Sequence, residues 1–336
     1  MKQLLSFGII ILIMLSCKSN EITSIDFTIA FGSCNRQNID NKLWDDVLNN
    51  NPNIWVWGGD IIYSDTDDMI KMANDYELLL NQKEYDSLRK TIEVHGTWDD
   101  HDYGLNDGGE EYIKKAESQK LLLDFLEVDK EDNRRNREGV YYSKLFSLAK
   151  GTINLIVLDT RYFRSALVES KNPDKRYGPT DNKNTTMLGE VQWKWLEAEL
   201  INTKSDFNVI VSSVQFLSAE HGFETWGNMP HEVSKLLNII KSSKAKGVII
   251  LSGDRHISEF SQMDLDSVSY PLIDFTSSGL THSYSNFTEE PNKYRIGDVV
   301  SSTSFGLLKF NFGTKKVIMQ MKGDENELYQ EINVQY

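Results

Sequence analysis

One stretch decides the fold: Ile54-Trp55-Val56-Trp57-Gly58-Gly59-Asp60-Ile61-Ile62-Tyr63. It opens with apolar, β-branched and aromatic residues, which are typical of a short buried strand. The two glycines that follow let the backbone turn sharply, so that the carboxylate of Asp60 projects from the end of the strand. We therefore expect a strand, then a functional loop, then a helix, with polar side chains placed where the strand stops.

The same order of strand, loop and helix recurs along the chain. The expected strands are residues 25–31, 54–57, 92–95, 153–158, 209–213, 248–252, 307–310 and 317–321, and the expected helices are 43–48, 109–126, 188–200 and 230–241. Residues 165–186 are polar and without periodicity, which indicates a long loop on the substrate side. Alternating strands and helices favour a layered α/β fold whose sheets are largely buried on both faces.

Carboxylates follow four of the predicted strands. They are Asp60, Asp100, Asp159 and Asp254. Chemistry in layered α/β folds gathers on the loops beyond the strand ends, so we expect all four on one rim of the molecule.

Donors of a different kind accompany these carboxylates and indicate a metal site. Cys34 follows the first predicted strand, Tyr63 lies three residues after Asp60, and an imidazole occurs in both Trp98-Asp99-Asp100-His101-Asp102 and Gly253-Asp254-Arg255-His256. A thiolate and a phenolate suit a trivalent iron, whereas carboxylates suit a harder cation such as calcium. A carboxylate shared by two cations holds them in the arrangement used for in-line attack on phosphorus.

Each of these features has a simpler structural explanation. Cys34 alone is more often a small buried apolar residue than a ligand, and Tyr63 alone is more often part of a core. The two acidic stretches around His101 and His256 are each compatible with a polar turn held by a salt bridge. Four such clusters at four strand ends make these separate explanations less economical than one metal site.

The first residues of the chain predict export and a lipid anchor. Leu4 to Leu15 is a nearly unbroken apolar run, too short for the roughly 20 residues that span a bilayer, and Ser16-Cys17 follows it. We expect a lipoprotein signal peptide at residues 1–16, a lipid on Cys17, a short tether at 17–25 and a single domain at 26–336. An ordinary signal peptide or a short anchor is the alternative. The lipoprotein interpretation places the protein in a bacterial cell envelope, at the periplasmic face or the cell surface.

The charge of the chain restricts its partners. The formal net charge is −14, and nucleic acid binding requires basic surface that this composition does not supply. We expect a monomer with no nucleic acid partner.

The ordered motifs resemble one family. They are Ala30-Phe31-Gly32-Ser33-Cys34-Asn35, Gly59-Asp60-Ile61-Ile62-Tyr63, Trp98-Asp99-Asp100-His101-Asp102, Leu158-Asp159-Thr160-Arg161-Tyr162 and Ser252-Gly253-Asp254-Arg255-His256. Together they are similar to the motifs of the PhoD-like alkaline phosphatase D family, over nearly the whole chain after residue 27. The resemblance implies a calcineurin-like metallophosphoesterase sandwich, in which two central mixed β-sheets are flanked by helices.

The resemblance also implies metals and their ligands. The implied ligands are Cys34, Asp60, Tyr63, Asp100, Asp254 and His256. Cys34 and Tyr63 would bind Fe³⁺, and Asp60 would bridge to Ca²⁺, with another divalent metal as the alternative. Asp100 stands where related phosphoesterases carry a metal-binding asparagine. Which cation Asp254 and His256 contact stays open.

The activity that follows is hydrolysis of phosphoric monoesters or diesters at a membrane surface. A metal-activated hydroxide would attack phosphorus in line with the leaving oxygen, which His101 would protonate. Arg161 is the first candidate to neutralise the phosphoryl oxygens and Arg36 the second, although Arg161 would equally serve to pair with Asp159 and fix its loop. The alternative function is a surface lipoprotein with a structural metal site that binds a glycan or protein partner through its tryptophans.

Overall fold

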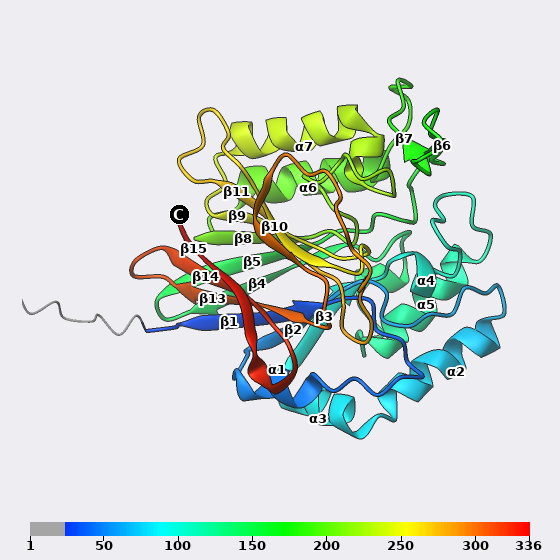
Figure 1. Ribbon diagram of the computed structural model, residues 1–336, viewed down its shortest axis with the longest axis horizontal. Coiled ribbons are helices and arrows are strands. Elements are labelled where there is room, and N and C mark those ends of the chain that lie inside the picture. The colour runs from blue at the N-terminus through cyan, green and yellow to red at the C-terminus, as the bar shows by residue number, and fades with distance from the viewer. Residues whose placement is uncertain (1–23) are drawn as a thin grey trace, which may run out of the picture.

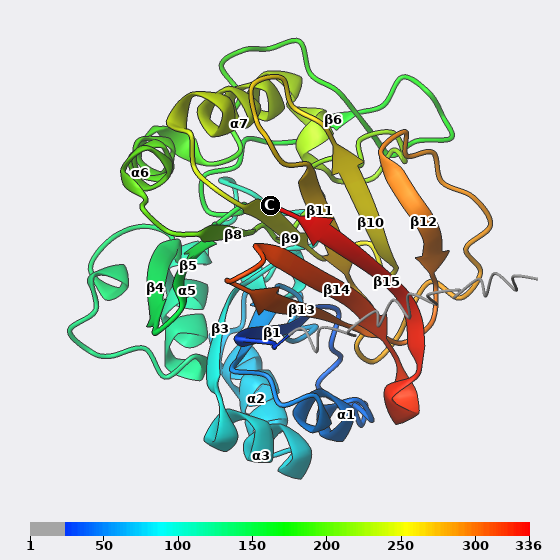
Figure 2. The same ribbon diagram turned by 90° about the vertical axis from the view of Figure 1, so that its left-hand side faces the viewer.

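Two β-sheets lie face to face, and helices cover the outer side of each (Figure 1). The computed structural model describes residues 24–336. The predicted signal peptide and Cys17 lie outside the described residues. Within them the chain forms the predicted α/β sandwich, with two large mixed sheets flanked by helices. Figure 2 shows α6 and α7 on one side of the strands and α1 to α3 on the other.

The first sheet contains six strands. In order across the sheet they are β15 (Leu328–Gln335), β14 (Lys316–Lys322), β13 (Phe305–Asn311), β1 (Phe27–Gly32), β2 (Ile54–Gly58) and β3 (Glu93–Thr97). Strands β1, β2 and β3 are parallel, and β13 to β15 are antiparallel to their neighbours.

The second sheet contains seven strands. In order they are β12 (Arg295–Val300), β10 (Ser258–Met263), β11 (Leu272–Ser277), β9 (Val248–Ser252), β8 (Phe207–Val211), β5 (Gly151–Val157) and β4 (Tyr142–Leu148). Strands β5, β8, β9 and β11 are parallel. A separate short pair joins β6 (Val168–Glu169) to β7 (Tyr177–Gly178).

Helices cover the two sheets, and two of the longer ones carry recognisable start signals. The helices are α1 (Trp44–Asn49), α2 (Met69–Leu80), α3 (Lys83–Thr91), α4 (Asp100–Tyr103), α5 (Lys115–Phe125), α6 (Gly189–Asn202) and α7 (Pro230–Ser243). The Asp68 side chain caps α2 by accepting from two backbone amides, and Pro230 occupies the first turn of α7. Among the described residues, we find no helix with the length and apolar character needed to span a bilayer.

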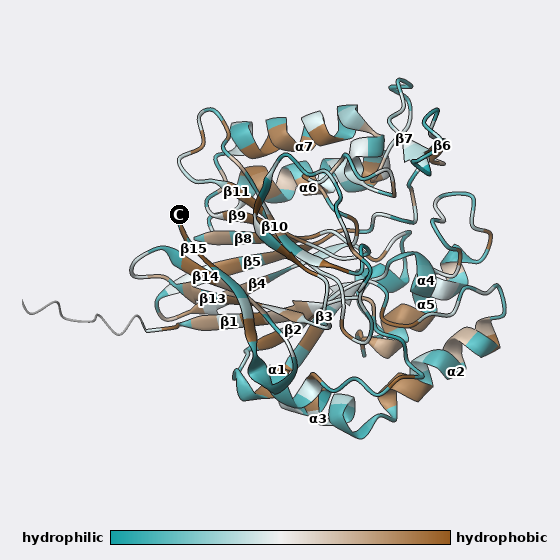
Figure 3. Ribbon diagram, viewed as in Figure 1, coloured by the Kyte–Doolittle hydropathy of each residue, from teal (hydrophilic) through white to brown (hydrophobic). Residues whose placement is uncertain are grey.

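Three apolar cores hold the layers together. One fills the space between the sheets, one lies between the first sheet and α1 to α5, and one lies between the second sheet and helices α6 and α7. Figure 3 shows apolar strands inside and polar helix surfaces outside. Six of the seven tryptophans are buried: Trp44, Trp55, Trp57, Trp98, Trp193 and Trp226.

Three expectations need correction. The helix predicted from residue 109 begins only at Lys115, because the Glu110 amide donates to the carbonyl of Arg164 and draws this part of the chain into a turn. Helices α2 and α3 were not predicted. The loop at residues 165–186 contains the short β6–β7 pair.

Candidate metal centre

Loops from both sheets meet at one end of the sandwich. The predicted ligands come from the loops after β1, β2, β3 and β9: Cys34 from the first, Asp60 and Tyr63 from the second, Asp100 from the third, and Asp254 and His256 from the fourth. The parallel strands point the same way, so their carboxyl ends deliver these side chains to a common place. The structure brings all six together, as described below.

The first donor set combines sulfur, phenol, carboxylate and imidazole. The Cys34 thiol and the Tyr63 hydroxyl each lie within hydrogen-bond distance of Asp60 Oδ2, at 3.3 Å and 3.2 Å. The Tyr63 hydroxyl is also 3.0 Å from His256 Nε2. Donor atoms of Cys34, Asp60 and His256 lie within 4.8 Å of one another, close enough to hold one cation.

The second donor set consists of carboxylates. Oxygens of Asp60, Asp99, Asp100 and Asp254 all lie within 4.8 Å of one another. Asp60 belongs to both sets. Its Oδ1 atom and Asp99 Oδ2 are buried without a hydrogen-bond partner among the described residues. An unsatisfied buried carboxylate oxygen is costly, and a cation at this point would satisfy both.

The backbone is strained at four of the donors. Cys34, Asp60, Asp254 and His256 have φ angles of 60°, 50°, 67° and 55°. Non-glycine residues seldom adopt this left-handed conformation, and such residues cluster at functional sites. The strain accompanies tight turns at the strand ends, which aim these side chains at one point.

Asp99 enters the centre through a close backbone approach. A Cβ atom added at Gly59, which has φ of 93°, would stand 2.5 Å from the Asp99 Cβ. Only glycine therefore lets the loop after β2 lie against the loop after β3. Asp99 was not among the predicted ligands, although it stands inside the quoted Trp98–Asp102 motif.

Burial dominates the protonation of the donors. It raises the pKa of the Cys34 thiol to about 11 and that of Asp254 to about 8, where the charge of Asp100 adds to the effect. Burial, followed by the charge of Cys34, raises the pKa of Asp60 well above its usual value. Burial lowers the pKa of His256 to about 3. Without a cation, Cys34, Asp60 and Asp254 therefore keep their protons to higher pH than usual, whereas His256 stays neutral. A bound cation would favour the deprotonated forms of the three acids.

His101 lies at the edge of the centre. Its ring stacks on Tyr63 with the centroids 4.1 Å apart, and its Nδ1 atom is 2.7 Å from the carboxylate of Asp65. Burial alone would lower the pKa of His101, but the charge of Asp60 and the Asp65 contact raise it to about 10. The imidazole is thus fixed through one nitrogen and favours its protonated form.

The two candidate arginines occupy different environments. Arg161 is completely buried, and its guanidinium donates to Asp99 Oδ1 at 2.6 Å and to Glu224 at 2.5 Å. Arg36 is exposed and lies over the ring of Tyr63, 5.1 Å from the ring centroid. Arg161 is thus enclosed by acidic partners, whereas Arg36 is open to solvent beside the first donor set; which of the two contacts substrate stays a prediction.

Asp159 lies after β5, as predicted, but its carboxylate is used to hold the surrounding loops together. It accepts from the Trp98 indole, from the backbone amide of Val140 and from the backbone amides of Arg161 and Tyr162. The pairing expected between the Arg161 guanidinium and Asp159 is wrong, because that guanidinium binds Asp99 and Glu224 instead.

Sequence reasoning missed two neighbours of the first donor set. Ser278 Oγ lies 3.0 Å from the Cys34 thiol, and the His282 ring centroid is 4.5 Å from that of His256. Both follow the carboxyl end of β11. The rule that strand ends carry chemistry would have indicated them if β11 had been recognised as a parallel strand.

Known proteins give an independent comparison. The family model of the PhoD-like phosphatases matches residues 29–304. Alkaline phosphatase D of Bacillus subtilis is 31% identical over 121 residues, which cover 33% of this chain and only 20% of that protein. A solved structure of PhoD superposes with a TM-score of 0.68 at 18% identity, covering 93% of this chain and 69% of that one.

A dimetal phosphatase from Danio rerio shares the fold as well. It superposes with a TM-score of 0.56 at 16% identity, covering 93% of this chain and all of that one. The family match spans most of the chain and contains every predicted ligand. This protein therefore belongs to the PhoD-like phosphatase family.

Proposed function

We propose that this protein is a metal-dependent phosphoric ester hydrolase, acting on phosphomonoesters or phosphodiesters at a membrane surface. The observation that carries the proposal is the position of Asp60, whose buried carboxylate belongs to two donor sets and keeps one oxygen without a partner. Family membership supports the same chemistry. The membrane location rests on the lipid site predicted at Cys17 in a bacterial cell envelope.

The donor chemistry fits two different cations. Cys34, Tyr63 and His256 with one Asp60 oxygen would hold Fe³⁺, since thiolate and phenolate favour a trivalent ion. Asp60 with the carboxylates of Asp99, Asp100 and Asp254 would hold Ca²⁺ or another divalent ion. When bound, such cations supply positive charge to a phosphoryl group and lower the pKa of water.

Two further residues would bind the substrate or donate a proton to it: Arg36 and His101, whose ring nitrogen lies within 4.8 Å of carboxylate oxygens of Asp60 and Asp100. His101 favours its protonated form and is held by Asp65 through Nδ1, so its other nitrogen would give a proton to the leaving oxygen. Arg36 is exposed beside Tyr63 and would bind the phosphoryl oxygens. Arg161 would not contact the substrate but would hold the Asp99 carboxylate in place through its hydrogen bond to Oδ1.

The glycan-binding alternative has less support. It depends on exposed tryptophans, and six of the seven are buried in the cores. In the His221–Trp226 loop, Glu224 is buried against Arg161 and Phe223 is partly exposed.

A direct assay tests the proposal. The protein, loaded with iron and calcium, is given a phosphomonoester and a phosphodiester in parallel, before and after chelation. We expect turnover of at least one ester, lost on chelation and restored by adding the metal back. Metal bound at full occupancy with no turnover of either ester would instead support a structural metal site.

A further inference from the structure

A cavity of about 320 Å³ opens at the end of the molecule opposite the candidate metal centre. Asp206 and Gly247, which directly precede β8 and β9, line it. The metal donors follow the other ends of the parallel strands. The remaining walls come from the end of α7, the turn before β11, the turn between β13 and β14, and Tyr336.

Four lysines line this cavity: Lys241, Lys244, Lys246 and Lys315. Lys315 pairs with Asp206 at 2.6 Å. Among residues 24–336, no carboxylate, that of Tyr336 included, lies within 4.0 Å of the other three ammonium groups, although this turn-rich end also carries Asp264 and Asp266. Three lysines that line one cavity without acidic partners, in a chain of net charge −14, give this end of the molecule a local positive charge that would attract an anion. We call these three residues the lysine cluster.

The described chain begins at the same end. Ser24 accepts through its carbonyl from Asn311 at 2.7 Å, and Asp26 pairs with Lys150 at 2.7 Å. The turn that follows Asn311 carries Lys315, whose carbonyl accepts from the Tyr336 amide at 2.9 Å. Figure 1 shows the start of β1, the end of α7 and the β13–β14 turn on one side of the molecule, with α4 on the other.

The tether is short. Cys17 stands seven residues before Ser24, and a fully extended chain of that length spans about 25 Å at most. A lipid on Cys17 would therefore hold this end of the domain close to the membrane. Attraction between lysines and an anionic leaflet acts over about one Debye length, roughly 10 Å, so proximity decides whether it operates.

We propose that the lysine cluster binds the phosphate-bearing headgroups of an anionic membrane, beside the lipid on Cys17. The inference rests on the proposed lipid anchor. It fixes the orientation of the domain: the metal centre, at the far end of both sheets, faces away from the anchoring membrane. The ester that the centre takes would then arrive from solution or from an opposing surface.

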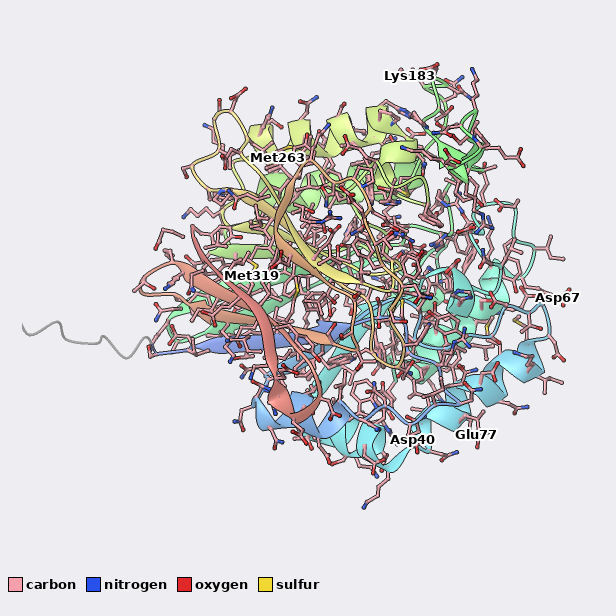
Figure 4. The ribbon with its side chains drawn as sticks, viewed as in Figure 1. Asp40, Asp67, Glu77, Lys183, Met263 and Met319 are labelled. Carbon is pink, nitrogen blue, oxygen red and sulfur yellow. The ribbon has the colours of Figure 1, made fainter. Side chains whose placement is uncertain are left out.

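Lysine acylation on the intact lipidated protein tests this orientation. The protein is reconstituted into vesicles of phosphatidylcholine alone, or with phosphatidylglycerol added, and treated with a water-soluble acylating reagent. Flotation establishes anchoring, and mass spectrometry gives the modification rate of each lysine. Lys183, which Figure 4 shows beside β6 and β7 on the side away from the start of β1, is the internal reference.

We expect the modification rate of the lysine cluster in the phosphatidylglycerol vesicles to be at most about one third of its rate in phosphatidylcholine vesicles. The rate of Lys183 should be the same in both, and high salt should abolish the protection. Equal rates in both vesicles, with the protein floating, would overturn the inference and leave the anchor intact. A protein that floats with neither vesicle lacks the anchor, and the inference fails with it. Glycerol phosphate carries the same recognised group, so only protection without any membrane that equals the protection by vesicles at the same phosphate concentration would make this a free-phosphate site and overturn the membrane proposal.

An activity assay separates this result from the catalytic proposal. The triple variant Lys241→Gln, Lys244→Gln, Lys246→Gln should hydrolyse a soluble phosphomonoester at the unchanged rate, because the cluster lies at the other end of the sheets. Loss of that activity in the folded variant would contradict the separation of the two sites.

Discussion

Asp60 and Asp274 are both carboxylates in the interior of the protein, yet their surroundings differ. Asp274, on β11, accepts from the amides of Phe216 and Leu217 at 2.9 Å each and from Ser252 Oγ at 2.7 Å. Asp60 has one oxygen without any partner, and thiol and phenol donors on the other. Burial raises the pKa of both, that of Asp274 to about 6. Burial alone does not mark a functional acid, whereas an unpartnered oxygen at the meeting point of two donor sets does so for Asp60.

Matched substitutions test this comparison most strongly. Asp60→Asn removes the negative charge shared by the two donor sets, so we expect kcat/KM for a phosphomonoester to fall by at least about 10³-fold. The metal-free variant should remain as stable as the parent, since the unpartnered oxygen has no hydrogen bond to lose. Urea unfolding of the metal-free proteins and steady-state kinetics measure the two effects.

Asp274→Asn is the control and should behave in the opposite way. The backbone amides of Phe216 and Leu217 both donate to Oδ2 and the Ser252 hydroxyl donates to Oδ1, so the NH2 group of the variant must replace one of these two acceptors, which costs about 1–3 kcal/mol of unfolding free energy. Turnover by the folded fraction should stay unchanged. The comparison breaks down if Asp60→Asn loses stability first, as a purely structural metal site would require.

The two arginines extend the same contrast to positive charge. Arg161→Gln leaves Asp99 and Glu224 buried without their main cation, so we expect a loss of about 3–5 kcal/mol of unfolding free energy. Arg36→Gln is a surface change that should alter stability by less than about 0.5 kcal/mol. It should nevertheless lower kcat/KM by about tenfold, if Arg36 binds the phosphoryl oxygens.

Unfolding midpoints and kinetics on the same preparations separate these roles. A stable Arg161→Gln protein with impaired substrate binding, together with an unaffected Arg36→Gln protein, would restore the order first predicted from the sequence.

Local patterns were sufficient for most of the fold. Strands β2, β5, β8 and β9 are largely apolar and end at polar loops, and the structure confirms them within a few residues of the predicted bounds. Helix α3 escaped prediction because most of its residues are charged or polar and only Tyr85 and Leu88 are buried. Helix α2 has a recognisable local signal that sequence reasoning missed, an Asp68 cap followed at helical spacing by Met72, Tyr76 and Leu79.

The candidate site was predictable where a ligand ends its own strand. Asp60 and Asp254 fulfil that condition, and the structure brings them together. The burial of Arg161 was not predictable, because it depends on Glu224, which lies 63 residues away in the sequence. The role of Asp99 as a ligand was not predictable either, because it depends on the close packing of Gly59 against the loop that carries Asp99.

The smallest expected effect concerns pH. The pKa of Asp254 is about 8 in the folded, metal-free protein, raised by burial and by the charge of Asp100 above an ordinary value of 3.8. Between these values the folded state holds a proton that the unfolded chain has lost, so the stability of the metal-free protein should fall as pH rises toward 8. A bound cation displaces this proton. The apparent affinity for the cation should therefore rise with pH, by up to about tenfold per pH unit, until pH reaches about 8.

Thermal unfolding of metal-free and calcium-loaded protein between pH 6 and 9 measures this effect. The difference in Tm should widen as pH rises to about 8 and then widen less steeply, because the Asp254 proton no longer competes with the cation. Asp274 sharpens the test: its own proton is lost near pH 6 in both forms, so it changes each curve without changing their difference. A difference that stays constant from pH 6 to 8 would show that the cation does not displace a proton from the carboxylate cluster.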